Sequence, residues 1–400
     1  MSEWGSAARL SPVRLDRPDA GLRERTLGRD ADLWRLDWVL ALAVASLLGL
    51  GSLLVWSATR QRLLDGGLDP QGYLERHLLN ALIGFAIATV VTLVDYRTIH
   101  AYAPVVYVAS CLGLVAVLTP LGSTINGAHS WIVVGGGFQV QPSEFAKVAL
   151  VVGMAVLLAD RRDREHTPRS TDVLLVLALA AVPVVLVLLQ PDLGTVLVLV
   201  FTVLGVLAIG GAPFRWLAGL VLAGALVSVA AVQVGVLDDY QVDRFAAFTN
   251  PELDPRGAGY NTNQARIAIG SGGIFGKGLF EGTQTRGRFI PEQQTDFVFT
   301  VAGEELGLVG ASTVILLLGV VLWRGLRIAS RSPDAFGRLV AAGVVCWFAF
   351  QSFVNIGMTL GIMPVTGLPL PFVSYGGSAM FANLAAVGLL QSVHLRSRDL

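Results

Sequence analysis

Long apolar segments separated by short polar turns recur along most of the chain. Each holds close to the roughly 20 apolar residues that a helix needs to cross about 30 Å of hydrocarbon. Because lipid offers no water to pair with backbone groups, such segments are expected to be α-helices. The pattern predicts ten membrane spans, at residues 36–58, 77–95, 101–120, 142–160, 172–190, 192–210, 214–236, 297–323, 338–361 and 377–394.

One long polar interruption breaks this pattern between the seventh and eighth predicted spans. It is rich in glycine, ends in the sequence PEQQTDF and is longer than a connection between two helices requires. We therefore expect the chemistry of the protein in this loop, together with an amphipathic interfacial helix at 261–269. The predicted organisation is a mostly disordered cytoplasmic tail (1–35), spans 1–7 (36–236), a large extracytoplasmic loop (237–296), spans 8–10 (297–394) and a short cytoplasmic tail (395–400).

The composition agrees with a membrane protein. Hydrophobic residues make up 54% of the chain and charged residues 14%, against roughly 25% charged residues in an average soluble domain. A membrane β-barrel would show alternating segments of about ten residues, and the sequence has none. The expected fold class is therefore all-α, a polytopic integral membrane protein of about ten transmembrane helices.

The charged residues exclude one class of partner and predict an orientation. Basic and acidic residues balance at 29 each, which argues against binding to nucleic acid. Arginine is concentrated in the amino-terminal tail and in the turns on that side of the predicted membrane. The short turns on the other side, near 120–141, 190–192 and 362–376, carry none. The positive-inside rule therefore predicts cytoplasmic termini and an outward-facing loop.

Charged groups inside a predicted span need an explanation, because each costs about 2.5–3.5 kcal/mol on insertion scales. Glu144 and Lys147, in the sequence QPSEFAK, lie three residues apart and so share one face of a helix. One interpretation is a mutually neutralising pair near the interface, with Lys147 reaching toward water. The other is a pair that lines a polar cavity open to the outer side.

A second group of carboxylates occurs in the sequence TDFVFTVAGEELGLVG. Asp296 stands at the mouth of the eighth predicted span, and Glu304 follows roughly 12 Å deeper on nearly the same helical face. Asp296 alone could be a helix N-cap. Two adjacent carboxylates at depth, Glu304 and Glu305, are harder to explain as structural groups, so this segment is a candidate site.

The glycine-rich stretch GSGGIFGKG at 270–278 is not a nucleotide-binding motif. A phosphate-binding loop needs Gly, four residues and then Gly-Lys-Ser/Thr. Here the residue five before Gly276 is Ser271, and Lys277 is followed by Gly278. The sequence therefore predicts no organic cofactor, and its scattered histidines do not indicate a histidine metal site.

Five motifs in chain order resemble one family. QPSEFAK, QPDLGT, NPELDPRGAGYNTNQARIAIGSGGIFGKGLFEGTQ, FIPEQQTDFVFTVAGEELGLVG and GLPLPFVSYGGS are similar to the SEDS family, the RodA and FtsW proteins of bacterial cell-wall synthesis. The resemblance covers nearly all of 36–394. The GLPLPFVSYGGS turn, stiffened by prolines, and the short carboxyl tail resemble RodA more than FtsW.

The resemblance implies a peptidoglycan glycosyltransferase that polymerises lipid II into glycan strands during cell-wall elongation. A sugar hydroxyl would displace polyprenyl pyrophosphate with inversion, and Asp296 matches the family's essential aspartate, the expected general base. Family membership also implies a class B penicillin-binding protein (a transpeptidase) as partner, and a location in the bacterial cytoplasmic membrane with the active site facing outward. A divalent cation, Mg²⁺ or Mn²⁺, is a further expectation, with Glu144 as its ligand.

The resemblance also suggests which side chains contact the substrate. The expected substrate-binding residues are Glu144, Lys147, Arg244, Lys277, Glu304 and Ser374. One position departs from the family, which often carries an arginine just before the tryptophan of the 126–131 segment. Here the segment reads Asn-Gly-Ala-His-Ser-Trp, so a phosphate contact made by that arginine cannot be carried over.

Three alternatives remain open from the sequence. A lipid II flippase would also need many spans and intramembrane charges, although no inverted repeat is visible and the charges gather toward one face. A scaffold without activity would tolerate replacement of Asp296. The division-type paralogue of the same polymerase would share every motif named above.

Overall fold

The computed structural model describes residues 35–125, 128–135, 139–162, 168–234 and 257–397. The chain divides into an amino-terminal unit, Met1–Leu36, and a helical unit, Asp37–Leu400. The predicted disordered tail therefore lies outside the described residues, apart from its last position. The same holds for the first part of the predicted outer loop.

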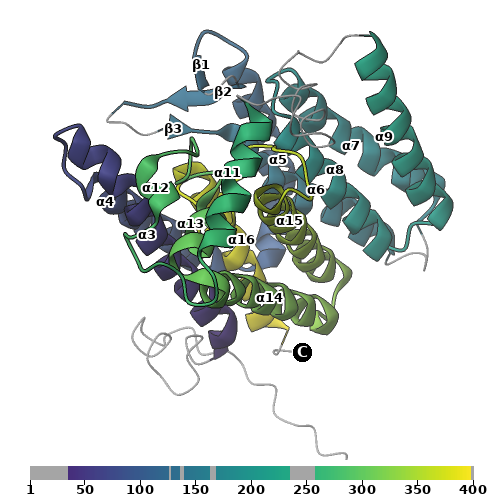
Figure 1. Ribbon diagram of the computed structural model, residues 1–400. Coiled ribbons are helices and arrows are strands. Elements are labelled where there is room, and N and C mark those ends of the chain that lie inside the picture. The colour runs from purple at the N-terminus through teal and green to yellow at the C-terminus, as the bar shows by residue number, and fades with distance from the viewer. Residues whose placement is uncertain (1–34, 126–127, 136–138, 163–167, 235–256, 398–400) are drawn as a thin grey trace, which may run out of the picture. The chain divides into compact units, whose positions relative to one another are not determined.

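The described part of the helical unit is built almost entirely from helices (Figure 1). Before the small sheet these are α3 (Trp38–Asp65), α4 (Gly72–Leu93) and α5 (Tyr96–Val117). Between the sheet and the outer loop they are α6 (Pro142–Arg162), α7 (Ser170–Leu188), α8 (Leu193–Ile209) and α9 (Phe214–Val234). The loop and the remainder contribute α11 (Ala258–Ser271), α12 (Thr283–Gly287), α13 (Val298–Glu305), α14 (Gly307–Arg331), α15 (Ala335–Leu360) and α16 (Gly377–Arg396).

The prediction of an all-α membrane protein is confirmed. Within the described ranges, 9 helices are long and apolar enough to cross a membrane, and α8 is a shorter apolar helix. Nine of the ten predicted spans each coincide with one helix, with ends that differ by a few residues. The helix predicted at 261–269 is present within α11 (Ala258–Ser271), and its interfacial location stays a prediction.

A three-stranded antiparallel sheet between α5 and α6 was not predicted. Its strands are β1 (Gly122–Ile125), β2 (Ala128–Val133) and β3 (Gln139–Val140), in the order β1-β2-β3. The Ser378 hydroxyl at the start of α16 accepts a hydrogen bond from the Gln141 N–H at 2.9 Å and donates to the Gln139 carbonyl at 3.2 Å. The sheet is thereby fixed to the end of the bundle at which α16 begins.

The prediction of one continuous span at 297–323 is wrong, because the structure has two helices there. α13 ends at Glu305 and α14 begins at Gly307, which adopts a left-handed φ of 66°. The backbone groups freed by the break pair with the glycine-rich loop. Lys277 N donates to Glu304 O at 3.0 Å, and Leu308 N donates to Gly273 O at 2.9 Å. The freed groups therefore have partners within the protein.

Glycine makes this close backbone pairing possible. A Cβ atom at Gly276 would lie 2.1 Å from the Glu305 carbonyl oxygen, and one at Gly307 would lie 2.3 Å from the Gly276 nitrogen. Such distances exclude any side chain at either position. The stretch that resembled a phosphate-binding loop is therefore the segment that packs against the helix break.

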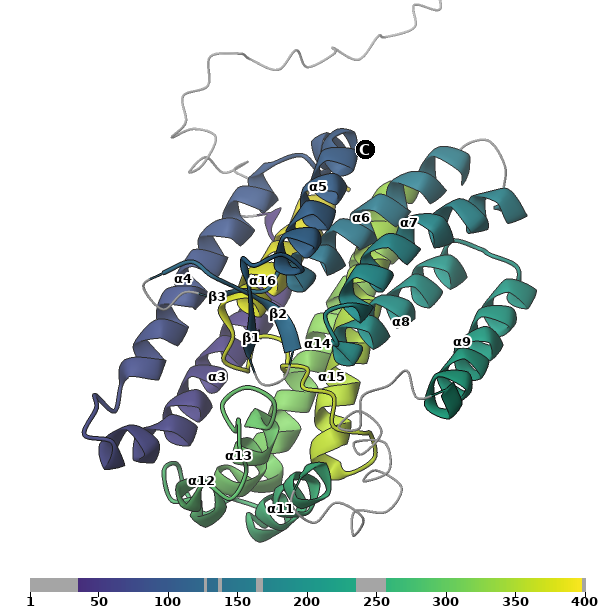
Figure 2. The same cartoon turned by 90° about the horizontal axis from the view of Figure 1, so that it is seen from above.

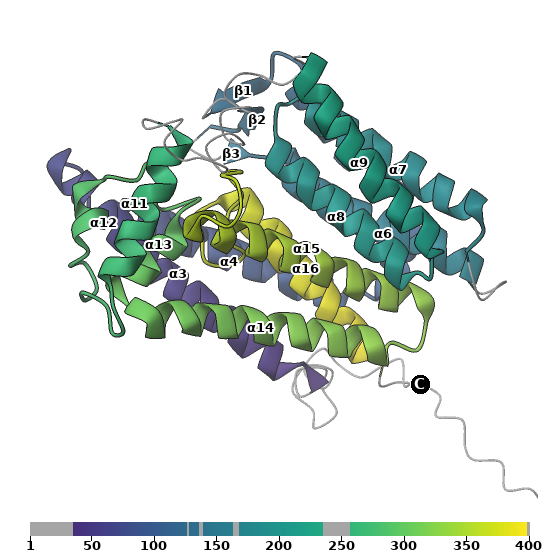
Figure 3. The same cartoon turned by 45° about the vertical axis from the view of Figure 1, so that its right-hand side comes forward.

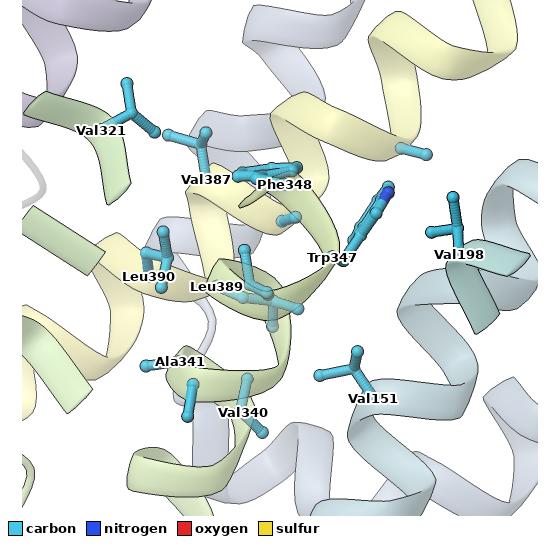
Figure 4. Close-up of a cluster of buried hydrophobic side chains, with 14 of the residues drawn as sticks. Val151, Val198, Val321, Val340, Ala341, Trp347, Phe348, Val387, Leu389 and Leu390 are labelled. Atoms are coloured by element: carbon cyan, nitrogen blue, oxygen red, sulfur yellow. The ribbon is translucent and has the colours of Figure 1, made fainter. Parts of the chain in front are cut away.

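Helix α15 forms the centre of the core. It packs against α6, α8 and α14, while α16 packs against α4. Trp347 and Phe348 are fully buried, and Figure 4 shows Trp347 on the side of α15 that faces Val198 of α8. Helix α9 lies at the edge of the bundle, next to α8 (Figure 2). The small sheet, α11 and α12 gather at one end of the bundle (Figure 3).

An ion pair between Asp37 and Arg324 holds the amino-terminal end of α3 against α14. The Arg324 guanidinium on α14 donates through Nε to both carboxylate oxygens of Asp37, at 3.0 and 2.7 Å. Gln391 of α16 accepts from the Asp37 N–H and donates to the Asp37 carbonyl, both at 3.0 Å. These bonds join three helices that are distant in the sequence.

We predict that Asp37→Ala destabilises the protein by about 3–5 kcal/mol, because it leaves the largely buried Arg324 guanidinium without its counter-charge. The free energy of unfolding in mixed micelles measures the effect. The control is Asp160→Ala, which removes an exposed partner of His100 and should cost about 0–1 kcal/mol. Equal losses in the two variants would contradict the prediction.

Candidate active site

A cavity of about 190 Å³ lies at the end of the bundle that carries the sheet. Its walls come from the sheet, the turn before α8, the segment before α13 and the segment between α15 and α16. Three carboxylates line it, those of Asp192, Glu292 and Asp296. The other lining residues are Ile125, Ala128, Ser130, Trp131, Gln141, Pro191, Leu193, Leu197, Thr295, Pro364, Val365, Thr366, Gly367, Pro369, Tyr375, Gly376 and Ala379.

Asp296 lies in a tight turn immediately before α13 and is half-buried. Its N–H donates to the Glu292 carbonyl at 3.1 Å. The residue at the N-cap position of α13 is Phe297, so Asp296 is not the capping residue. The Asp296 carboxylate faces Gly367, where a Cβ atom would lie 3.5 Å from Oδ2.

The backbone around Asp296 is held by α15 and by the segment between α15 and α16. The amide of Asn355, fully buried on α15, donates to the Asp296 carbonyl at 2.9 Å and to the Leu368 carbonyl at 2.6 Å. The Ser374 hydroxyl donates to the Thr295 carbonyl. The Tyr375 N–H donates to the Gln294 carbonyl at 2.8 Å. Three consecutive carbonyls thus have a partner on the opposite wall.

The predicted pair Glu144 and Lys147 lies beneath this segment, on α6. Lys147 Nζ lies 2.8 Å from each carboxylate oxygen of Glu144, and both side chains are almost completely buried. The same ammonium donates to Gln351 Oε1 at 3.0 Å, and Gln351 Nε2 donates to the Pro369 carbonyl at 2.8 Å. The pair therefore connects to the cavity wall through Gln351 and does not itself line the cavity.

The other two cavity carboxylates are engaged in local contacts. Asp192 caps α8, accepting from the Thr195 N–H at 2.9 Å and from the Thr195 hydroxyl at 2.8 Å. Glu292 Oε2 accepts from Gln294 Nε2 at 3.1 Å and from the Thr295 hydroxyl at 3.3 Å. These contacts suit structural roles for both carboxylates.

Glu304 lies elsewhere and does not share a helical face with Asp296, because α13 starts only at Val298. It is fully buried and accepts bonds from the N–H groups of Gln284 and Thr285 at 2.8 and 2.9 Å. Lys277 Nζ donates to it at 2.9 Å. Glu304 therefore fixes the loop segment 277–285 to α13, and neither Lys277 nor Glu304 lines the cavity.

The sequence-predicted site residues thus fall into separate groups. Asp296 lines the cavity and Ser374 supports its wall, while Glu144 and Lys147 lie beneath. Arg244 lies outside the described residues. Sequence reasoning missed Gln351 and Asn355, although two amide side chains four residues apart in an apolar span are themselves a signal of a buried polar site.

The residues at Glu144 do not fit a divalent cation. The carboxylate already holds the Lys147 ammonium against both oxygens, and a metal ion would have to displace that charge in a buried place. In the described part of the chain, no group of three or more His, Cys, Asp or Glu residues is placed to hold a metal ion.

Comparison with known proteins identifies relatives along almost the whole chain. Residues 38–399 match the family of cell cycle proteins that comprises FtsW, RodA and SpoVE. The peptidoglycan glycosyltransferase MrdB of Escherichia coli K12 is 37% identical over 92% of this chain and 96% of its own length. The stage V sporulation protein E of Bacillus subtilis is 36% identical over 90% of this chain and 98% of its own length.

Solved structures share the fold. A chain from a study of the structural coordination of polymerization and crosslinking by a peptidoglycan synthase complex superposes with a TM-score of 0.76 and is 35% identical. The match covers 90% of this chain and 98% of that one. The crystal structure of the rod shape determining protein RodA from Thermus thermophilus gives a TM-score of 0.66 at 34% identity, over 90% and 96% of the two chains.

We predict that Glu304→Gln loosens the loop segment 277–285. The neutral amide keeps the shape of the side chain but has only one accepting oxygen, so charge-assisted bonds from this segment are lost. Protection of the Gln284 and Thr285 amides in hydrogen exchange should fall roughly ten- to a hundredfold. Glu281→Gln, at an exposed glutamate of the same loop, should leave it unchanged. Full protection in Glu304→Gln would disprove the role of Glu304.

Proposed function

The chain belongs to the FtsW, RodA and SpoVE family of cell cycle proteins, and on that premise we propose that Asp296 is the general base of its reaction. The protein is an integral membrane peptidoglycan glycosyltransferase, as its relatives are named. The observation that carries the proposal is the position of Asp296: its carboxylate lines the cavity while Asn355 holds its backbone carbonyl.

The substrate we propose is lipid II, a lipid-linked sugar diphosphate. A hydroxyl of one molecule attacks the anomeric carbon of a second, forming a new carbon–oxygen bond. Its proton passes to the Asp296 carboxylate. The bond between the anomeric carbon and the diphosphate breaks, and the electron pair leaves with polyprenyl diphosphate. A single displacement inverts the α-linked donor into a β-1,4 linkage.

The need to position the base explains why side chains hold so many backbone carbonyls in the cavity wall. A general base must lie within hydrogen-bond reach of the proton it removes, and a displacement of about 1 Å can cost roughly 100-fold in rate. Asn355 holds the Asp296 carbonyl, and Ser374 holds the Thr295 carbonyl. Gln351 holds the facing segment at Pro369. We therefore assign Asn355, Gln351 and Ser374 as positioning residues.

We assign the charged pair on α6 a supporting role. Lys147 neutralises Glu144 and donates to Gln351, so the pair acts on the cavity through that amide. Direct contact of Glu144, Lys147, Lys277 or Glu304 with substrate stays a prediction from resemblance. A divalent cation at Glu144 is not supported by the geometry of that pair, and none of the steps above depends on one.

Orientation and partners follow from the same proposal. The arginine distribution supports cytoplasmic termini and a cavity that opens on the outer face of the bacterial cytoplasmic membrane, where a lipid-linked sugar has its sugars. A structural relative comes from a complex that couples polymerization with crosslinking. We propose accordingly that this chain works with a class B penicillin-binding protein, whose transpeptidase would crosslink the new strand.

We assign the enzyme to cell-wall elongation because its GLPLPFVSYGGS turn resembles RodA. Overall identity does not separate elongation from division: MrdB of Escherichia coli is 37% identical, and the probable peptidoglycan glycosyltransferase FtsW of Mycobacterium tuberculosis is 38% identical. A flippase role finds less support, since relatives named for their activity are named glycosyltransferases.

Asp296→Asn should reduce the turnover of lipid II roughly 10²- to 10⁴-fold, because the amide keeps the shape but cannot take the proton. Glycan strands made by the purified protein, with and without its transpeptidase partner, report the loss. Asp160→Asn, an exposed aspartate in α6, is the matched control and should be as active as the wild type. An active Asp296→Asn enzyme would exclude the base role.

Asn355→Leu should lower kcat by about 100-fold while the protein remains folded. The change leaves two buried carbonyls without a donor, at a cost of about 1–3 kcal/mol, and releases the backbone of Asp296. Polymerisation rate and thermal unfolding are measured together. Asn383→Leu replaces another buried asparagine, outside the cavity lining, and should keep kcat within a few fold. Unchanged kcat in Asn355→Leu would refute the positioning role.

A further inference from the structure

A second cavity, of about 670 Å³, lies at the turn that joins α3 to α4. We refer to it as the arginine groove. The groove is lined by three arginines, two aspartates and a tyrosine, together with small and apolar residues. The polar lining residues are Arg62, Asp65, Asp69, Tyr73, Arg76 and Arg288.

Positive charge is in excess in the arginine groove. Arg288 forms an ion pair with Asp65, and Asp69 accepts a hydrogen bond from the Gln71 N–H at 2.9 Å. Among the described residues, neither Arg62 nor Arg76 has a carboxylate within ion-pair distance. Two guanidinium groups are therefore available to an anion, and guanidinium matches phosphate geometry with paired N–H donors.

Arg288 has a backbone conformation that is unusual for a residue with a side chain. It is the C-cap of α12 and has a left-handed φ of 55°, where glycine or asparagine is usual. Its guanidinium reaches across to α3, where it also donates to the Gln61 carbonyl at 3.2 Å. The strained residue thus closes one side of the groove and joins the loop that leads to Asp296 with α3.

Tyr375 links the arginine groove to the cavity of Asp296. It lines that cavity, and its ring meets the Tyr73 ring edge-on at 5.1 Å between centroids. Burial raises the pKa of the Tyr375 hydroxyl, and the Arg76 guanidinium beside it opposes this shift. Both Tyr73 and Arg76 line the groove. Tyr375, which lines the cavity of Asp296, thus contacts residues that line the arginine groove.

The two spaces have opposite charge. The described lining of the cavity includes three carboxylates and no arginine, lysine or histidine. A diphosphate in that cavity would be repelled by the carboxylates, at a cost that a nearby cation would have to offset. The arginine groove holds such cations on the far side of Tyr375. Exposed leucines continue from it along α4, among them Leu78, Leu79 and Leu82.

We propose that the arginine groove binds the diphosphate of the lipid-linked sugar donor, through Arg62 and Arg76. The donor sugar then reaches past Tyr375 into the cavity, and the polyprenyl tail follows the apolar surface of α4 in the membrane. As the bond to the anomeric carbon breaks, these arginines take up the negative charge that develops on the leaving diphosphate. This assignment rests on the proposed glycosyl transfer and names the donor side of its site.

The test is binding of undecaprenyl diphosphate to the full-length protein in lipid nanodiscs, with Arg62→Gln/Arg76→Gln compared with wild type. We expect the Kd for undecaprenyl diphosphate to rise at least tenfold, because losing one charge-assisted hydrogen bond usually costs that much affinity. The KM for lipid II should rise with it. Arg62→Lys/Arg76→Lys should bind with intermediate affinity. Arg60→Gln, the matched control on the same helix outside the groove lining, should bind as wild type does.

Three results would overturn the assignment. An unchanged Kd in Arg62→Gln/Arg76→Gln, or an equal loss in Arg60→Gln, would mean that no specific site exists. Equal displacement of the probe by phosphatidylglycerol would make the groove an ordinary site for anionic headgroups. Asp296→Asn separates this proposal from the proposed function. If that variant polymerises normally while Arg62→Gln/Arg76→Gln loses the probe, the base role fails and the groove is supported.

Discussion

Two amide side chains on α15 hold the candidate site together. Non-helical backbone inside a membrane bundle has no water to bond with, so its carbonyls must find donors in the protein. Gln351 and Asn355, both fully buried, donate to carbonyls of the segment between α15 and α16, and Asn355 also donates to Asp296. Without these donors, the turn that carries Asp296 would no longer be held in a fixed position against the wall of the cavity.

The need to pair every buried backbone group also explains how the break in the eighth span is tolerated. The interrupted helix exposes backbone groups at Glu304 and Leu308, and the glycine-rich loop supplies their partners. The buried Glu304 carboxylate then binds backbone N–H groups at the start of α12. Binding charge to several donors offsets the cost of burying it. The part of the outer loop from α11 to Asp296 is thereby held in place against the bundle.

The sequence was sufficient for the spans but not for the contacts. Hydropathy predicted nearly every helix because apolar length alone decides whether a segment can cross a membrane. It could not show the break after Glu305, since the cause is a loop about 30 residues earlier that packs on Gly307. Asp296, a candidate from its position and from the resemblance, lines the cavity. The shared helical face predicted for Asp296 and Glu304 is wrong, because α13 starts only at Val298. The sequence shows the two amides of α15 as polar groups in an apolar span, but it does not show which carbonyls they bind.

The most direct measurement is chemical rescue of Asp296→Ala by formate during lipid II polymerisation. A small carboxylate can enter the space left by the shortened side chain and take the proton that Asp296 would have taken. If Asp296 is the general base, the rate should recover in proportion to formate concentration, and wild type should not respond. If formate restores nothing while the variant stays folded and still binds lipid II, the carboxylate of Asp296 is not the base.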